Sequence, residues 1–140
     1  MLESLPGTAL KNDYAMDPLR VFLVENHEDT LKYMQLFLEQ LSYQVCVAAD
    51  MATALREIPK SHCDVLISDI GLPDGDGWEL IEKLGDNRPQ FAIAMSGYGT
   101  GNDQRRSRAA GYDHHLVKPF PPDALLSLLR ELGRTKETPS

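Results

Sequence analysis

The residues of this sequence that could do chemistry are polar side chains placed directly after short apolar segments. They are Glu25 and Asn26, with Glu28 nearby, then Asp69, Ser96 and Lys118. Carboxylate, amide and main-chain oxygens are the ligands that Mg²⁺ prefers, and a carboxylate can attack phosphorus to form an acyl phosphate. A lysine and a hydroxyl can then hold the phosphoryl oxygens. The set therefore suits phosphoryl chemistry beside a divalent cation.

Asp69 stands at the end of the apolar segment Cys63–Asp69, which contains neither Pro nor Gly. The central residues Val65, Leu66 and Ile67 are typical of a short strand buried on both faces of a parallel sheet. In such sheets ligands bind beyond the carboxyl ends of the strands, and Asp69 would lie there. The alternative is that Asp69 only starts the turn-rich segment that follows, because Asp is common where strands stop.

Five apolar segments alternate with five segments that have helical character. Strands are expected at residues 19–24, 43–48, 63–69, 91–95 and 112–117. Helices are expected from the polar cluster after residue 24 to about residue 41, over 50–58 with Pro59 just past the end, over 78–84 and 102–110, and from Pro122 onward. Gly97, Gly99 and Gly101 predict a mobile loop. The alternation predicts an α/β fold, with a doubly wound parallel sheet and helices on both faces.

Length and composition indicate one globular domain. The 140 residues divide into an irregular N-terminal extension (1–17), a core domain (18–133) and a polar tail (134–140). The net charge of −7 argues against broad binding to nucleic acid. No apolar run has the length of a membrane span, and the N-terminus lacks the features of a signal peptide, so we expect a cytoplasmic protein without membrane contact. Cys46 and Cys63 are expected to be buried free thiols.

Other patterns in the chain are better explained by structure than by ligand binding. Surface positions are expected for three histidines whose spacing matches no zinc pattern, His27, His62 and His114. Asp74–Gly77 begins like a calcium loop, but Trp78 occupies a ligand position and no Glu closes the loop, which favours a turn. The glycines after the fourth strand fail as a dinucleotide fingerprint, because Asn102 stands where the third glycine is needed.

The motifs together resemble the receiver domain of bacterial two-component response regulators. The resemblance covers about residues 18–133 and rests on LRVFLVEN, DVLISDIGLPDGDGWEL, AMSGYG, AAGYDHHLVKPF and a final leucine-striped helix. It implies a flavodoxin-like fold with five parallel strands in the order 2-1-3-4-5. It also implies a cis peptide bond between Lys118 and Pro119, a geometry that X-Pro bonds adopt at low cost.

The resemblance also implies roles for individual residues. Asp69 would be the phosphoacceptor, Ser96 the hydroxyl that turns toward the phosphoryl group, Lys118 its cationic partner, and Gly97 a backbone contact of the phosphoryl group. The implied Mg²⁺ ligands are Glu25, Asn26, Asp69 and the main-chain carbonyl of Gly71.

Two residues depart from the family pattern. Asn26 replaces the second acid of the metal-binding pair, so we predict weaker Mg²⁺ binding and slower phosphotransfer than in a two-acid relative. His115 replaces the Tyr or Phe that commonly switches between inward and outward positions. It could switch in the same way or be held by a polar partner, and we hypothesise that it makes the output sensitive to pH.

The expected function is that of a stand-alone receiver domain, or of a receiver domain within a hybrid histidine kinase, and not of a turnover enzyme. A histidine kinase or phosphotransfer protein would phosphorylate Asp69, and a downstream protein would bind the face formed by the fourth helix, fifth strand and fifth helix. Arg105, Arg106 and Arg108 are either a solvated helix face or a docking patch for an acidic partner. The alternatives are a pseudo-receiver that works without phosphorylation, favoured by Asn26, and an aspartyl-phosphate hydrolase, disfavoured because Gly71 stands where its second acid is needed.

Overall fold

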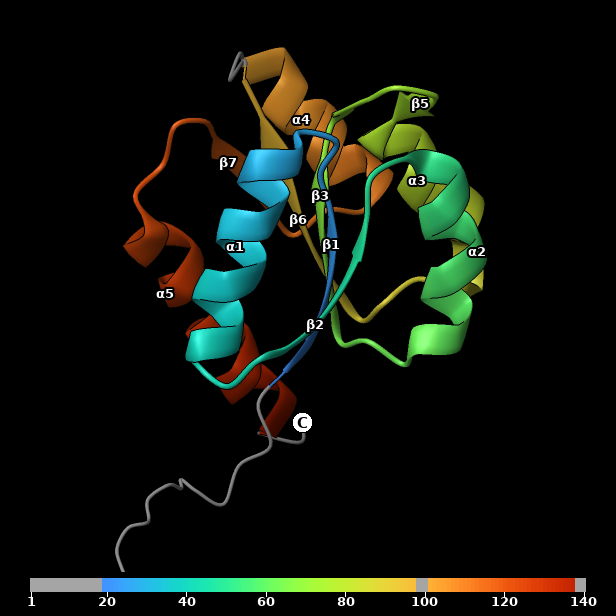
Figure 1. Ribbon diagram of the computed structural model, residues 1–140. Coiled ribbons are helices and arrows are strands. Elements are labelled where there is room, and N and C mark those ends of the chain that lie inside the picture. The colour runs from blue at the N-terminus through green and yellow to red at the C-terminus, as the bar shows by residue number, and fades with distance from the viewer. Residues whose placement is uncertain (1–18, 98–100, 138–140) are drawn as a thin grey trace, which may run out of the picture.

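The structure is a computed structural model that describes residues 19–97 and 101–137. The predicted N-terminal extension, and Gly99 of the predicted mobile loop, lie outside the described residues. Within the described part, one parallel sheet has the strand order β2-β1-β3-β6-β7 (Figure 1). Its strands are β1 (Arg20–Val24), β2 (Gln44–Ala48), β3 (Val65–Asp69), β6 (Phe91–Ser96) and β7 (His114–Val117). Counting these five strands along the chain gives the predicted order 2-1-3-4-5.

Helices cover both faces of the sheet, as the alternating pattern predicted. They are α1 (Glu28–Gln40), α2 (Met51–Ser61), α3 (Gly77–Leu84), α4 (Gly101–Ala110) and α5 (Pro122–Glu137), with a short 3₁₀ turn at Gly85–Asn87 after α3. Helices α1 and α5 lie on one side of the sheet, whereas α2 and α3 lie on the other (Figure 1). The loops at the carboxyl ends of the strands therefore gather at one end of the molecule.

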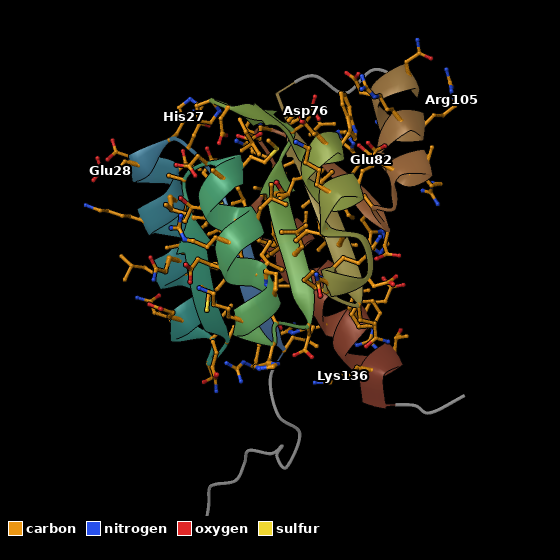
Figure 2. The ribbon with its side chains drawn as sticks, turned by 90° about the vertical axis from the view of Figure 1, so that its right-hand side faces the viewer. His27, Glu28, Asp76, Glu82, Arg105 and Lys136 are labelled. Atoms are coloured by element: carbon orange, nitrogen blue, oxygen red, sulfur yellow. The ribbon has the colours of Figure 1, made fainter. Side chains whose placement is uncertain are left out.

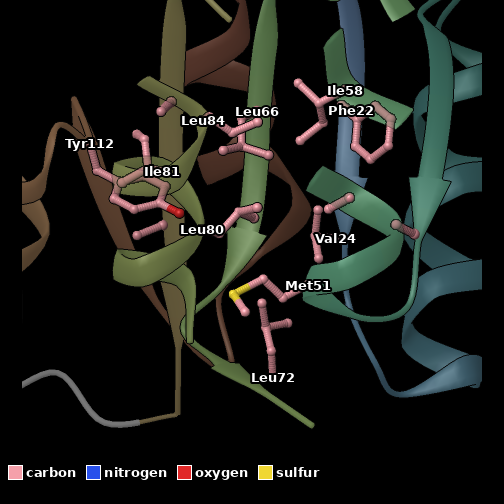
Figure 3. Close-up of a cluster of buried hydrophobic side chains, with 14 of the residues drawn as sticks. Phe22, Val24, Met51, Ile58, Leu66, Leu72, Leu80, Ile81, Leu84 and Tyr112 are labelled. Atoms are coloured by element: carbon pink, nitrogen blue, oxygen red, sulfur yellow. The ribbon is translucent and has the colours of Figure 1, made fainter. Parts of the chain in front are cut away.

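Two apolar clusters, one on each face of the sheet, hold these layers together. On the α2–α3 face, Phe22 and Leu66 of the sheet pack with Leu80 and other helical side chains (Figure 3). On the opposite face, Leu23 and Ile67 pack with Leu129 and others from α1 and α5. Because β3 is buried at every position, it contributes to both clusters, as the uninterrupted apolar run predicted.

A short hairpin that the sequence analysis did not predict lies between β3 and α3. Strands β4 (Gly71–Leu72) and β5 (Gly75–Asp76) pair antiparallel. The Asp74 carboxylate accepts hydrogen bonds from the backbone N–H groups of Met51 and Ala52, at 2.7 and 2.9 Å. Asp76 caps α3 by accepting from the backbone N–H of Glu79 at 2.7 Å. The predicted turn is therefore present, and its two aspartates stabilise helix N-termini.

Several local predictions need correction. Pro59 lies inside α2, because its φ is compatible with a helix and only one backbone hydrogen bond is lost so near the end. Helix α5 continues to Glu137, into the segment predicted as a polar tail. Cys46 is exposed and Cys63 is half-buried, because β2 is an edge strand and Cys63 precedes β3. Both thiols are free, as predicted. Among the described residues, no helix is long and apolar enough to cross a membrane.

Candidate functional site

The candidate site lies at the carboxyl end of the sheet and is built by β1, β3, β6 and β7. Parallel pairing places Asp69 beside Met95 and Ser96 beside Val117, so the residues that end neighbouring strands meet at one edge. His27, Asp76 and Arg105 lie at this end of the molecule, whereas Lys136 lies at the other (Figure 2).

Lys118 joins the two carboxylates at the centre of the site. Its Nζ donates to Glu25 Oε1 at 2.6 Å and to Asp69 Oδ2 at 3.0 Å. The lysine is positioned by the backbone, because its own N–H donates to the Ser96 carbonyl at 2.7 Å. The Lys118–Pro119 bond is cis, as the resemblance implied. The Glu25 side chain is fully buried and that of Asp69 is 8% exposed. The two buried anions thus share one ammonium group.

The pKa values of the two carboxyl groups are shifted in opposite directions. Burial raises the pKa of Asp69, and the charge of Glu25 adds to this effect, although the Lys118 ammonium opposes it. Burial also acts to raise the pKa of Glu25, but hydrogen bonds from Lys118 and His27 outweigh it, so the pKa of Glu25 is lowered. The pKa of Lys118 is raised, because its contacts with Glu25 and Asp69 exceed the cost of burying its charge. Glu25 and Lys118 therefore form a strong ion pair beside the more basic carboxylate of Asp69.

A cavity of about 460 Å³ opens onto Asp69. Most of the predicted site residues line it, and the full set is His27, Asp69, Ile70, Gly71, Trp78, Ser96, Gly97, Asp103 and Lys118. Glu25 is fully buried and takes part through Lys118 and His27. Asn26 is exposed and does not line this cavity, so its role as a ligand stays a prediction.

His27 lies in the site, although the spacing of the histidines predicted a surface polar residue unrelated to metal. Its Nδ1 lies 2.9 Å from Glu25 Oε2, and its backbone N–H donates to the same oxygen at 2.9 Å. The side chain is 70% exposed, so it is a surface residue as predicted, but at the rim of the cavity. Its position directly after the Glu25–Asn26 pair was the signal that could have identified it.

The ligand set of the site fits a divalent cation. Ligand atoms of Glu25, His27 and Asp69 lie within 4.8 Å of one another, which allows one ion to contact more than one of them. Carboxylate oxygens suit Mg²⁺, and the imidazole of His27 also suits transition metals. Chemically, the Asp69 carboxylate can act as a nucleophile, and Lys118 can hold negative charge that develops next to it.

The predicted switch residues are in direct contact. Ser96 Oγ lies 2.7 Å from His115 Nε2, and His115 Nδ1 lies 2.8 Å from Ser107 Oγ of α4. Of the two alternatives for His115, the structure therefore contains the one with polar partners. Burial lowers the pKa of His115, and the nearby Asp103 acts in the opposite direction.

Comparisons with known proteins agree with this geometry. Residues 21–130 match the family model described as "Response regulator receiver domain". The chain belongs to the response regulator receiver domain family. The fold agrees with that of a CheY-like response regulator receiver domain protein from Methanospirillum hungatei JF-1, with a TM-score of 0.80 and 30% identity over 86% of this chain and 97% of that one.

Similar curated proteins include both short and long chains. An uncharacterized 14.6 kDa protein of Leptolyngbya boryana is 31% identical over 120 residues, covering 79% of this chain and 87% of its own length. The transcriptional regulatory protein KdpE of Mycobacterium tuberculosis is 31% identical over 114 residues, and the match covers 81% of this chain and 50% of KdpE. The sensor protein EvgS of Escherichia coli K12 is 27% identical over 117 residues, which is 83% of this chain but 10% of EvgS. The chain thus spans half or less of the length of these longer relatives. Receiver domains in general are signalling phosphoacceptors of two-component systems.

Proposed function

We propose that this receiver domain accepts a phosphoryl group on Asp69 from a histidine kinase or a phosphotransfer protein. The observation that carries the proposal is the contact of the Lys118 ammonium with Asp69 and Glu25, at 3.0 and 2.6 Å, at the cavity that opens onto Asp69. An Asp69 oxygen would attack the phosphorus of the donor, and the bond from phosphorus to the donor's imidazole nitrogen would break. Lys118, Ser96 and the backbone of Gly97 would then hold the phosphoryl oxygens.

A bound Mg²⁺ would neutralise charge on the phosphoryl oxygens. Glu25, Asp69 and the Gly71 carbonyl are the proposed oxygen ligands, with Asn26 as a neutral fourth. Because Asn26 carries no charge, we predict weaker Mg²⁺ binding than in a relative with two acids.

Phosphorylation would change the affinity for a downstream protein partner on the face formed by α4, β7 and α5. Arg105 and Arg108 line a cavity of about 460 Å³ on this face, together with Leu116 and Leu128. Arg106 instead stacks on Trp78, with its Cζ 4.0 Å from the ring centroid. The docking patch proposed for an acidic partner is therefore centred on Arg105 and Arg108.

The second candidate function is a pseudo-receiver that binds partners without phosphorylation, and Asn26 is the observation that favours it. Intact-mass measurement after incubation with acetyl phosphate and Mg²⁺ separates the two. We expect a gain of one phosphoryl group that is absent in Asp69→Asn and retained in Asp113→Asn, a control at a carboxylate that hydrogen-bonds the backbone of Ala92. A wild-type protein that gains no phosphoryl group from acetyl phosphate or from a histidine kinase would support the pseudo-receiver.

A further inference from the structure

A continuous chain of hydrogen bonds leads from the phosphoacceptor cavity to α3. Ser96 Oγ contacts His115 Nε2 at 2.7 Å, and His115 Nδ1 contacts Ser107 Oγ at 2.8 Å. The indole Nε1 of Trp78 then contacts Ser107 Oγ at 2.9 Å. The two hydroxyl residues are buried, at 7% exposed for Ser96 and 1% for Ser107. We call these four residues the relay.

The donor direction of the relay follows from its far end. The Trp78 indole N–H can only donate, so Ser107 Oγ must accept from it. Within the described part of the chain, Ser107 Oγ has one other hydrogen-bond partner, His115 Nδ1. A buried hydroxyl that kept its proton unpaired would lose a hydrogen bond. Ser107 therefore donates to Nδ1, and the neutral imidazole of His115 carries its proton on Nε2.

This tautomer decides what Ser96 can do. The Nε2–H of His115 donates to Ser96 Oγ, which makes that oxygen an acceptor toward His115. The hydroxyl proton of Ser96 must then be donated to another acceptor. A phosphoryl oxygen on Asp69 is an acceptor only, so Ser96 could donate to it without giving up its bond to His115. In the opposite tautomer, the Ser96 hydroxyl would donate to His115 Nε2 and could not also donate to a phosphoryl oxygen.

We propose that Trp78 and Ser107 are positioning residues that fix the Nε2–H tautomer of His115 and thereby keep Ser96 as a hydrogen-bond donor for the phosphoryl group. The role of Ser96 toward a phosphoryl group rests on the proposed function of Asp69. The tautomer of His115 does not, because it is a property of the unphosphorylated protein. It assigns to the indole N–H and to the α4 hydroxyl a role in phosphoryl binding, although Ser107 does not line the cavity at Asp69.

The surroundings of His115 are compatible with a neutral ring. Helix α4 places Asp103, Arg105 and Arg108 near His115. Strand β7, to which His115 belongs, contributes His114, and Asp113 directly precedes this strand. Strand β6 contributes the uncharged Ser96, and α5 contributes Leu128. Burial lowers the pKa of His115 and outweighs the effect of Asp103, which favours the neutral ring.

The first test is the tautomer, read by ¹⁵N NMR of histidine-labelled protein at pH 7.5 without phosphorylation. We expect a protonated Nε2 and an unprotonated Nδ1 for His115. Trp78→Phe and Ser107→Ala should mix the two tautomers. Ser61→Ala should not, although it also removes a hydroxyl that donates within a helix, to the Ile58 carbonyl at 2.8 Å. A protonated Nδ1 in the wild type, or no change in both relay variants, would overturn the proposal.

The second test is the titration of His115 in the same samples. Ser107→Ala removes a hydrogen bond to the neutral ring, so the pKa of His115 should rise, with about a fivefold increase in its proton affinity. Ser61→Ala should leave it unchanged. An unchanged titration in folded Ser107→Ala would count against donation from Ser107 to Nδ1.

The third test is the rate of phosphoryl uptake from acetyl phosphate. Ser96→Ala should show the full decrease in this rate that follows from losing the Ser96 hydroxyl. Ser107→Ala should take up the phosphoryl group more slowly than wild type, by up to about fivefold. Adding Ser107→Ala to Ser96→Ala should cause no further loss, because both act through one hydroxyl. Additive losses would contradict the relay. A wild type that takes up no phosphoryl group, while His115 shows the expected tautomer, would reject the proposed function and leave the relay intact.

Discussion

At the scale of single residues, the site depends on how three charges share a buried space. Lys118 contacts both Glu25 and Asp69, so the ammonium compensates two carboxylates at once. Asp69 has a raised pKa and Glu25 a lowered one, which leaves Asp69 as the less tightly stabilised anion. That difference suits Asp69 as the nucleophile and Glu25 as a fixed partner of Lys118.

Replacing Lys118 by Met should destabilise the folded protein at neutral pH. Two buried carboxylates would remain without their shared cation, which typically costs about 3–5 kcal/mol. Without Lys118, the folded-state pKa of these carboxyls would exceed that in the unfolded chain. The penalty is then present above the folded pKa and is relieved as pH falls through it. Urea unfolding at pH 7 and pH 5 should therefore show a smaller deficit relative to wild type at pH 5, and an equal deficit would contradict the charge argument.

Replacing Asn26 by Asp should tighten Mg²⁺ binding about fivefold, because it adds one negative charge near the ion. The single tryptophan of the sequence, Trp78, lines the cavity, so its fluorescence can follow the titration. Asn87→Asp adds the same charge to the 3₁₀ turn after α3 and should leave the affinity unchanged. Equal affinities in wild type and Asn26→Asp would mean that Asn26 already serves as well as an acid, or does not contact the ion.

At the scale of elements, the end of β3 and the start of α3 are packed without spare room. A Cβ on Gly77 would lie 2.7 Å from the carbonyl oxygen of Asp69 and 3.1 Å from Ile70. The backbone N–H of Gly77 also donates to the Ile70 carbonyl at 2.8 Å, and its carbonyl accepts from the Tyr112 hydroxyl at 2.7 Å. The backbone of Asp69, the proposed phosphoacceptor, is thus held by the first turn of α3.

Gly77→Ala should destabilise the protein by about 1–3 kcal/mol, the usual cost of overpacking. The strain would act on the backbone of Asp69, so phosphoryl uptake should fall as well. Gly71→Ala is the matched control, because a Cβ there would meet no atom within 4 Å and the main-chain carbonyl is kept. Chemical denaturation of both variants checks the prediction, which would be wrong if they lost equal stability.

Much of this arrangement could be predicted from the sequence, because it follows from patterns that act over short distances. The apolar run that ends at Asp69 predicts a strand buried on both faces, and β3 is buried at every position. What could not be predicted depends on contacts between distant segments. The bond from Ser107 to His115, and the caps that Asp74 supplies to α2, join elements whose relative positions no local pattern encodes.

At the scale of the whole molecule, the two sides of the cavity are connected to different helices. On one side, the loop after β3 is bonded to α2 through Asp74. On the other side, Ser96 is bonded through His115 and Ser107 to α4 and α3. A change at Ser96 therefore has a direct route to α4 and β7, two of the three elements of the proposed partner face.

Hydrogen exchange should change unevenly when the protein is phosphorylated with acetyl phosphate and Mg²⁺. We expect altered protection in β6, α4 and β7, and little change in α2, because the relay contacts the former elements and not the latter. Mass spectrometry of peptides from Met51–Ser61 and Gly101–Ala110 compares the two regions, with Asp69→Asn treated identically as the control. An equal or larger change in α2 would contradict this prediction.

The two hydrogen bonds from the first turn of α2 to the Asp74 carboxylate also matter for protein engineering. The hairpin of β4 and β5 looks like a tolerant place for an inserted peptide, because Pro73 and Asp74 are exposed. An insertion between Leu72 and Gly75 would draw Asp74 away and leave two backbone N–H groups of α2 without their acceptor. A tag or sensor peptide spliced there would therefore loosen a helix that is remote from it in the sequence.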